Sequence, residues 1–258
     1  MRIDILTVFP EMIEAGLGYS IVKRARDRNL VEVNVVNLRD FTDDRHRTTD
    51  DVPYGGGGGM VMKIEPIGKA LAHIAASTNL GDSARIILTD PRGQKFTQSV
   101  ARQWASEQHI VLLCGHYEGV DERVRQHLVT DEVSIGDYVL TGGELPALVI
   151  TDAITRLQEG ALGDAEATAD DSFSGVLLEY PHYTRPSDYC GYEVPDILMC
   201  GHHARIERWR RWHQLRDTRE RRPDLFAQLE LTEPDRKLMN EEEPTAPPAK
   251  RIVQKTNS

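Results

Sequence analysis

The chain has 258 residues, 40% of them hydrophobic, so it can bury a real core and is not a wholly disordered protein. Domains of about 100–200 residues predict one large domain or two modest ones. The net charge of -10 gives no general affinity for phosphate, so any nucleic-acid binding must rest on a local basic surface.

Membrane insertion and secretion are not expected from the sequence. No run approaches the ~18 apolar residues of a membrane-spanning helix. The apolar stretch at the N-terminus ends at Pro10, which makes it too short for a signal peptide. We therefore expect a cytoplasmic protein with no membrane partner.

The first half of the chain alternates between strand and helix patterns. Short apolar or alternating runs predict strands at residues 3–9, 31–35, 85–89 and 109–114. Helical patterns lie between them at residues 12–29, 66–76 and 97–108. The turn sequence Asp90-Pro91-Arg92-Gly93 is expected to end the third strand. This alternation predicts an α/β fold with a mostly parallel sheet and helices on both faces.

Composition divides the chain into four parts. Residues 1–159 carry the α/β pattern and end in a helix at 143–159. Residues 160–175 are rich in Gly, Ala, Asp and Ser without an apolar period, which predicts a flexible linker. Residues 176–240 show helical patterns only and predict a small helical domain. Residues 241–258 are charged and Pro-rich, as expected of a disordered tail.

Three glycine-bearing segments fit ligand-contacting loops as well as ordinary connections. Gly55 to Gly59 is either a bland linker or a loop that lets a flat ligand approach the backbone. Residues 115–123 follow a predicted strand directly, and ligands of α/β sheets bind at strand ends. Residues 134–146 interleave apolar side chains with glycines, which suits an apolar slot with backbone donors and acceptors, as an adenine ring needs.

Several ordered motifs carry a resemblance to a known family. They are Asp44-Arg45-His46-Arg47-Thr48, Pro53-Tyr54-Gly55-Gly56-Gly57, Cys114-Gly115-His116-Tyr117-Glu118-Gly119, Ser134 to Pro146, Asp171-Ser172-Phe173 and Pro181-His182-Tyr183-Thr184-Arg185-Pro186. In this order, from Met1 to about Leu231, they resemble the bacterial tRNA (guanine-37-N1)-methyltransferase family of the TrmD type. That family belongs to the SPOUT class, and the resemblance implies a deep trefoil knot in the sheet.

The resemblance also implies a methyl donor, S-adenosyl-L-methionine, held by the knotted loops. By matching positions, the donor contacts are Leu88, Thr89, Pro91, Gly115, Tyr117, Glu118, Ser134, Ile135, Gly136, Asp137, Tyr138, Val139, Leu140, Gly142, Gly143 and Pro146. The family suggests a role for Mg²⁺ with Glu118 as a helper, although the sequence shows no metal-ligand cluster. The chain departs from the usual pattern at Gly58, at Asp90 and at His116, where many members have Arg.

A catalytic pair at Asp171 and Arg156 follows from the same resemblance. Methylation of a ring nitrogen that carries a proton needs a base, expected to be Asp171. The charge that builds on the neighbouring carbonyl oxygen needs a cation, expected to be Arg156. Without the resemblance, Asp171 would be interpreted as a helix cap and Arg156 as an ordinary exposed helix arginine.

The partners implied are tRNA and a second copy of the chain. The family is a homodimer whose active sites are shared between subunits. From His202 to Arg222, with Arg222 included, there are eight arginines, and the predicted helix at 204–219 carries Arg208 and Arg211, the expected RNA contacts. Ile206, Trp209 and Leu215 would face the core of the small domain.

Three rival interpretations remain open. A related knotted methyltransferase could act on a different RNA nucleotide, although the Asp171 and Arg156 pair favours guanine. A non-catalytic RNA-binding protein could use the same fold, but the intact donor-site glycines argue against it. A nucleotide-binding α/β hydrolase would carry a phosphate loop or a nucleophile elbow, and the sequence has neither.

Overall fold

The structure, a computed structural model, describes residues 1–78, 84–162 and 171–246. The chain divides into two compact units, Met1–Ala165 and Glu166–Ser258. Their boundary falls inside the predicted linker at 160–175, of which residues 163–170 lie outside the described residues, so the flexible linker stays a prediction. None of the helices in the described ranges is both long and apolar enough to cross a membrane.

The first unit contains a five-stranded sheet in which every neighbouring pair is parallel. In spatial order the strands are β2 (Glu32–Asn37), β1 (Arg2–Thr7), β6 (His109–Cys114), β5 (Arg85–Lys95) and β7 (Asp131–Ser134). A separate two-stranded ladder joins β3 (Asp50–Asp51) to β4 (Val61–Met62). The α/β fold with a mostly parallel sheet is therefore confirmed, whereas the trefoil knot stays a prediction.

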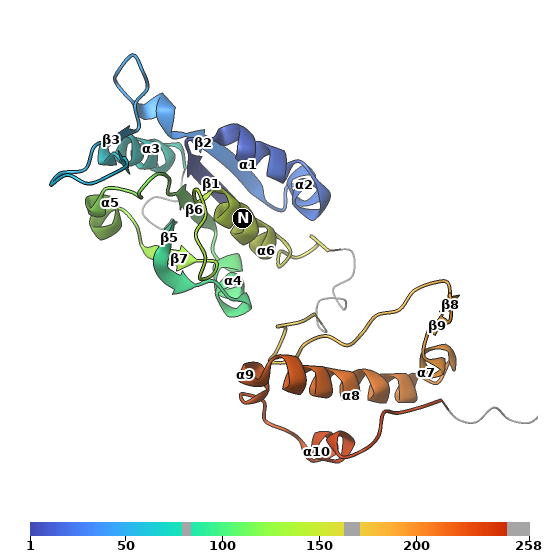
Figure 1. Cartoon of the computed structure of the whole chain (residues 1–258). Coiled ribbons are helices and arrows are strands. Elements are labelled where there is room, and N and C mark those ends of the chain that lie inside the picture. Colours follow the sequence, from blue (N-terminus) through green and yellow to red (C-terminus); the bar gives the residue numbers. More distant parts are fainter. Residues whose placement is uncertain (79–83, 163–170, 247–258) are drawn as a thin grey trace, which may run out of the picture. The chain divides into compact units, whose positions relative to one another are not determined.

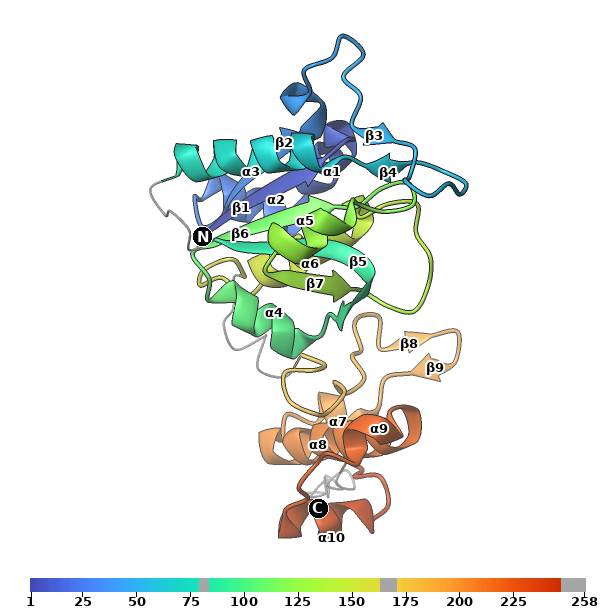
Figure 2. The same cartoon turned by 90° about the vertical axis from the view of Figure 1, so that its left-hand side faces the viewer.

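Helices cover both faces of this sheet, as Figures 1 and 2 show. One face packs against α1 (Pro10–Leu17), α2 (Ser20–Asp27), α4 (Gln98–Ala105) and α6 (Glu144–Thr155). The other packs against α3 (Ile64–Ser77), α5 (Glu122–His127) and the 3₁₀ turn η1 (Leu38–Phe41). In β6 the side chains alternate, because Ile110 and Leu112 join the first core and Val111 and Leu113 the second. The strand is buried on both faces, as parallel strands are.

Two local predictions in this unit are wrong. The expected single helix at 12–29 is broken into α1 and α2, because Ser20 adopts a left-handed backbone with φ of 54°. The turn sequence from Asp90 to Gly93 does not end β5. It marks an irregularity between Thr89 and Gln94, after which the strand pairs with β7 again. The short elements α5 and β7 were not predicted.

The second unit is built on the long helix α8 (His203–Arg221), with the short helices α7 (Asp196–Met199), α9 (Pro223–Phe226) and α10 (Glu233–Met239). Its core holds Trp212, Leu215 and Leu238, and Trp209 is also buried, whereas Ile206 is half-buried. The expectation of helices only is wrong. A hairpin joins β8 (Asp188–Tyr189) to β9 (Tyr192–Glu193), and both turn residues have positive φ, as the favoured two-residue turn requires.

The start of the predicted tail packs against α8, which differs from the expected disorder beginning at Glu241. The indole Nε1 of Trp209 donates to Glu243 over 2.8 Å, and that of Trp212 donates to the Glu241 carbonyl oxygen over 3.2 Å. Buried indoles need such acceptors, so these contacts have a physical reason. Residues 247–258 of the tail lie outside the described residues.

A buried charge cluster ties β1 to β6 at the start of both strands. Asp4 lies 2.6 Å from His109 Nε2 and accepts two hydrogen bonds from Arg2, over 2.8 and 2.9 Å. The side chains of Asp4 and His109 are each 1% exposed. Burial opposes ionisation of Asp4, but the hydrogen bonds from His109 and Arg2 outweigh it and lower its pKa below the ordinary value.

The cluster predicts a specific acid sensitivity. The pKa of Asp4 is lowered in the folded state, so ionised Asp4 adds to the free energy of unfolding. This contribution is complete above the unfolded pKa of about 3.9 and is lost as pH falls through the folded pKa. Asp4→Asn leaves a buried partner unpaired and should lower the free energy of unfolding by about 3–5 kcal/mol at neutral pH. Urea unfolding between pH 2 and 7 measures both effects. If the free energy of unfolding falls as steeply with decreasing pH in the variant as in the wild type, Asp4 is not the source of the acid sensitivity.

Candidate functional site

A cavity of about 220 Å³ lies at the carboxyl ends of β6 and β7, beside the irregular part of β5 between Thr89 and Gln94. Three segments surround it: the first is the irregular part of β5, the second is the loop that follows β6, and the third is the loop that follows β7. Its lining residues are Thr89, Asp90, Pro91, Gly115, His116, Tyr117, Glu118, Gly119, Val133, Ser134, Ile135, Gly136, Tyr138, Val139, Leu140, Thr141, Gly142, Gly143 and Pro146. Apolar side chains therefore alternate with glycine backbone around the opening.

The structure brings all but two of the predicted donor-contact residues to this cavity. Leu88 is fully buried in the core on the α3 face, because strand alternation turns its side chain away from the loops. Asp137 does not line the cavity either. The lining adds Asp90, His116, Gly119, Val133 and Thr141, which were not among the predicted contacts.

The third loop reaches the strand ends through two glycines. The Gly143 N–H donates to the Gly115 carbonyl oxygen over 2.7 Å, and His116 forms a backbone bridge with Gly142. A Cβ added at Gly143 would overlap Thr89 Oγ1 and lie 2.8 Å from Cys114 Cα. Only glycine fits here, because the backbone of the loop is inserted against the ends of β5 and β6.

The second loop is held in an uncommon backbone conformation. Tyr117 has φ of 59° although it carries a side chain, and Gly119 has φ of 118°. Backbone hydrogen bonds fix the loop to β4 and to the residue before it. The Glu118 N–H donates to the Met60 carbonyl oxygen over 3.0 Å, and the Met62 N–H donates to the Gly119 carbonyl oxygen over 2.9 Å. Non-glycine residues at positive φ gather at ligand sites, so Tyr117 is a structural signal for one.

The five-glycine segment does not line the cavity, but its last residue lies against Glu118, which does. A Cβ at Gly59 would overlap the side chain of Glu118, whereas the positions at Gly55, Gly56 and Gly58 are open. Gly59 also has φ of 83°, which disfavours any other residue. The end of the segment therefore sets where Glu118 lies, and its middle is unconstrained by neighbours.

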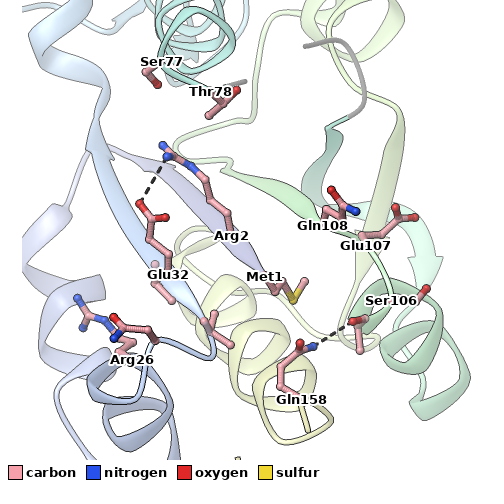
Figure 3. A pocket seen from close by; sticks show the side chains of 14 residues that line it. Met1, Arg2, Arg26, Glu32, Ser77, Thr78, Ser106, Glu107, Gln108 and Gln158 are labelled. Carbon is pink, nitrogen blue, oxygen red and sulfur yellow. Dashed lines mark hydrogen bonds and ion pairs between the residues drawn. The ribbon is translucent and has the colours of Figure 1, made fainter. Parts of the chain in front are cut away.

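A larger cavity, about 930 Å³, opens at the amino ends of β1 and β2 (Figure 3). Its polar lining is largely paired within the protein. Arg2 lies 3.4 Å from Glu32, and Gln158 Nε2 donates to the Ala105 carbonyl oxygen over 3.0 Å. Ligands of open α/β sheets bind at the carboxyl ends of the strands, so the smaller cavity is the better candidate.

The two predicted catalytic residues belong to different units. Arg156 follows the last residue of α6 as its C-cap, and it is half-buried. Asp171 belongs to the second unit and is also half-buried. Their pairing stays a prediction.

The two predicted RNA contacts on α8 both make ion pairs within the second unit. Arg208 pairs with Glu241. Arg211 donates two hydrogen bonds to Asp235, over 2.8 and 2.9 Å, and these lower the pKa of Asp235 to about 2. Arg211 is thus committed to holding α10 against α8, while Arg208, with half its side chain exposed, retains more freedom to meet a phosphate.

Within the described part of the chain, no group of three or more His, Cys, Asp or Glu side chains could hold a metal ion. Sequence reasoning also missed Glu144, which is 2% exposed at the start of α6. The signal that could have found it is a carboxylate in the first turn of an otherwise apolar helix, directly after the two glycines.

Comparison with known proteins gives a consistent set of relatives. Residues 1–228 match the family described as tRNA (Guanine-1)-methyltransferase TrmD. The chain is 52% identical to the tRNA (guanine-N(1)-)-methyltransferase of Desulforamulus reducens, covering 93% of this chain and 94% of the relative. It is 53% identical to the enzyme of that name from Brevibacillus brevis and 52% identical to that from Bacillus subtilis, each covering 93% of this chain and 98% of the relative.

The glycine insertion can be tested by stability alone. Gly143→Ala should lower the free energy of unfolding by about 1–3 kcal/mol, because the new methyl group overpacks the strand ends. Gly58→Ala is the matched control, since its Cβ meets no atom within 4 Å, and it should stay within about 0.5 kcal/mol of the wild type. Denaturant unfolding of the three proteins gives the comparison. Equal stability of both variants would show that the loop can move aside.

Proposed function

The chain belongs to the tRNA (guanine-1)-methyltransferase TrmD family, and we propose that it transfers a methyl group to the N1 atom of guanine 37 in tRNA, beside the anticodon. The observation that carries this proposal is the cavity beside β5 and at the carboxyl ends of β6 and β7. All but two of the donor contacts that the resemblance implies line this cavity. The enzyme is expected to work in the cytoplasm, where it would meet its substrate.

The methyl donor in this proposal is S-adenosyl-L-methionine, whose sulfonium supplies an activated methyl group. The lining fits an adenosyl ligand, because apolar residues such as Ile135, Leu140 and Pro146 surround backbone groups that can pair with a purine edge. The insertion of Gly142 and Gly143 keeps this part of the cavity narrow. A role for Mg²⁺ in the reaction, with Glu118 as a helper, is proposed on the resemblance to the family alone.

The catalytic step needs a base and a cation from this chain. We assign the base to Asp171, which removes the N1 proton of guanine so that the ring nitrogen can attack the methyl carbon. We assign Arg156 to the guanine O6 atom, where negative charge builds as the proton leaves. Positioning supplies the rest, because a sulfonium methyl needs little further activation.

The tRNA is proposed to contact the second unit, with α8 facing its phosphates. Arg208 is the better candidate for a phosphate contact, and Arg211 contributes by keeping α10 in place. The protein is proposed to act as a homodimer with shared active sites. The resemblance supports this proposal. The chain order alone, with the donor residues before the segment at 160–175 and Asp171 near its end, allows Asp171 to reach the donor site of either its own subunit or the partner.

The assigned base and nucleotide are tested together with tRNA transcripts and labelled donor. A transcript with guanine at position 37 should be methylated at N1, and one with adenine there should not. Asp171→Asn should lower the single-turnover rate by a factor on the order of 10² or more, because it keeps the size of the side chain but cannot accept the proton. Donor and tRNA binding should change little.

Two outcomes would contradict this part of the proposal. Equal methylation of both transcripts would remove the specificity for position 37. A near-normal single-turnover rate in Asp171→Asn would exclude Asp171 as the base.

The shared site is tested by mixing two inactive variants. One carries Gly142→Arg, whose side chain would overlap Glu144 and His116 at the wall of the donor cavity, and the other carries Asp171→Ala. In a two-fold dimer with shared sites, the mixed species has one doubly damaged site and one intact site. Activity should return on subunit exchange, up to about half that of the wild-type dimer. Lasting inactivity, with heterodimers shown to form, would mean that each site is built within one chain.

A further inference from the structure

Glu144 is a buried carboxylate beside the cavity that the proposed reaction does not yet use. It lies in the first turn of α6 and is 2% exposed. Its Oε1 atom accepts a hydrogen bond from Thr7 Oγ1 over 2.8 Å. Its Oε2 atom lies 3.6 Å from His116 Nδ1, which is too long for a hydrogen bond.

This carboxylate has little compensation within the chain. Among the described residues, Thr7 supplies the only hydrogen bond to it, and no Lys or Arg forms an ion pair with it. The amino end of α6 stabilises a negative charge in part. A buried charge still costs several kcal/mol unless a cation compensates it. Among the described residues, the ion-pair partner within reach of Glu144 is His116, at 3.6 Å, and that pair carries opposite charges only when the imidazole is protonated.

The charge of Glu144 acts on a buried group at the end of β6, next to the residues that line the cavity. Burial, and after it the negative charge of Glu144, raise the pKa of the Cys114 thiol at the end of β6. The separation from the cavity is small, because a Cβ at Gly142 would overlap both the Glu144 carboxylate and the His116 ring. Gly142 and His116 both line the cavity, so only a glycine and an imidazole lie between it and the carboxylate.

His116 is held in place by aromatic contacts. Its ring centroid lies 4.9 Å from that of Phe9 and 4.8 Å from that of Tyr117, which meets it edge-on. Its Nδ1 atom is buried and has no hydrogen-bond partner in the described structure. The imidazole is thus fixed with its Nδ1 atom near the carboxylate, 3.6 Å from Oε2, and no hydrogen bond joins the two groups.

We propose that Glu144 gives the cavity a fixed negative charge that favours the cationic sulfonium donor over the neutral thioether product. The inference rests on the proposed function, because it assumes that the cavity holds the donor. Methyl transfer removes the positive charge from the bound sulfur. The attraction to Glu144 is lost in the same step, which would weaken binding of the product relative to the donor.

The test is the ratio of two dissociation constants, measured by calorimetry on the full chain at one pH. The probes are S-adenosylmethionine, which is cationic at sulfur, and S-adenosylhomocysteine, which is neutral there. Glu144→Gln keeps the shape and the Thr7 hydrogen bond but removes the charge. It should weaken sulfonium binding by about tenfold, the order expected for one charge at an effective dielectric constant near 20, and change thioether binding less than threefold.

Two further variants separate charge from shape. Thr7→Val removes the hydrogen bond and keeps the carboxylate, so it should weaken both ligands alike and leave the ratio unchanged. His116→Arg places a permanent cation beside an intact Glu144 and should lower the preference for the sulfonium in the same direction as Glu144→Gln. This variant also serves if Glu144→Gln does not fold.

The outcomes distinguish this inference from the function on which it rests. Equal weakening of both ligands in Glu144→Gln, or an unchanged ratio in His116→Arg, would overturn the charge role and leave Glu144 a structural group. Failure of the wild-type protein to bind either adenosyl ligand would instead overturn the proposed donor site. A shifted ratio in both charge variants with an unchanged ratio in Thr7→Val supports the inference.

Discussion

The candidate site depends on one steric constraint, the insertion of Gly142 and Gly143 against the ends of β5 and β6. No side chain is tolerated at Gly143, because the space is already filled by Thr89 and the backbone of Cys114. This close approach brings the third loop to the other two and places the first turn of α6 beneath the cavity. The buried Glu144, the ring of His116 and the strained Tyr117 all take their positions from it.

Much of the fold could be predicted from residue patterns, and the failures have identifiable causes. Strand β6 was predicted at its exact residues, because a short, continuously apolar run from Ile110 to Cys114 that ends at Gly115 is typical of a strand buried on both faces. The break at Ser20 could not be predicted, since a serine with left-handed backbone is set by packing and not by its own preference. Strand β7 has only four residues and begins with two acids, so its own sequence carries too weak a pattern.

The site was predictable in its members but not in its electrostatics. Parallel strands end at one edge, so the loops after β6 and β7 were expected to meet there, beside the predicted turn at Asp90, and the ordered motifs supplied the residues. The same reasoning could not find the exclusion of Leu88 and Asp137 or the isolation of the Glu144 carboxylate. The positions of Leu88 and Asp137 outside the lining depend on side-chain direction, and the surroundings of Glu144 depend on the lack of a Lys or Arg partner among the described residues. The arginines of α8 show the same limit, because Arg211 is engaged by an acid 24 residues away.

The central place of β1 has a consequence for how the chain folds during synthesis. Arg2 pairs on one side with Glu32, which follows soon, but on the other side with His109. At about 5–20 residues per second, the second edge of β1 stays without its partner for several seconds after it leaves the ribosome. Strand β1 is therefore synthesised long before its pairing with β6 can be completed, and the buried contact between Asp4 and His109 forms equally late. Until β6 arrives, the nascent chain therefore presents an open, apolar strand edge that cellular chaperones could recognise.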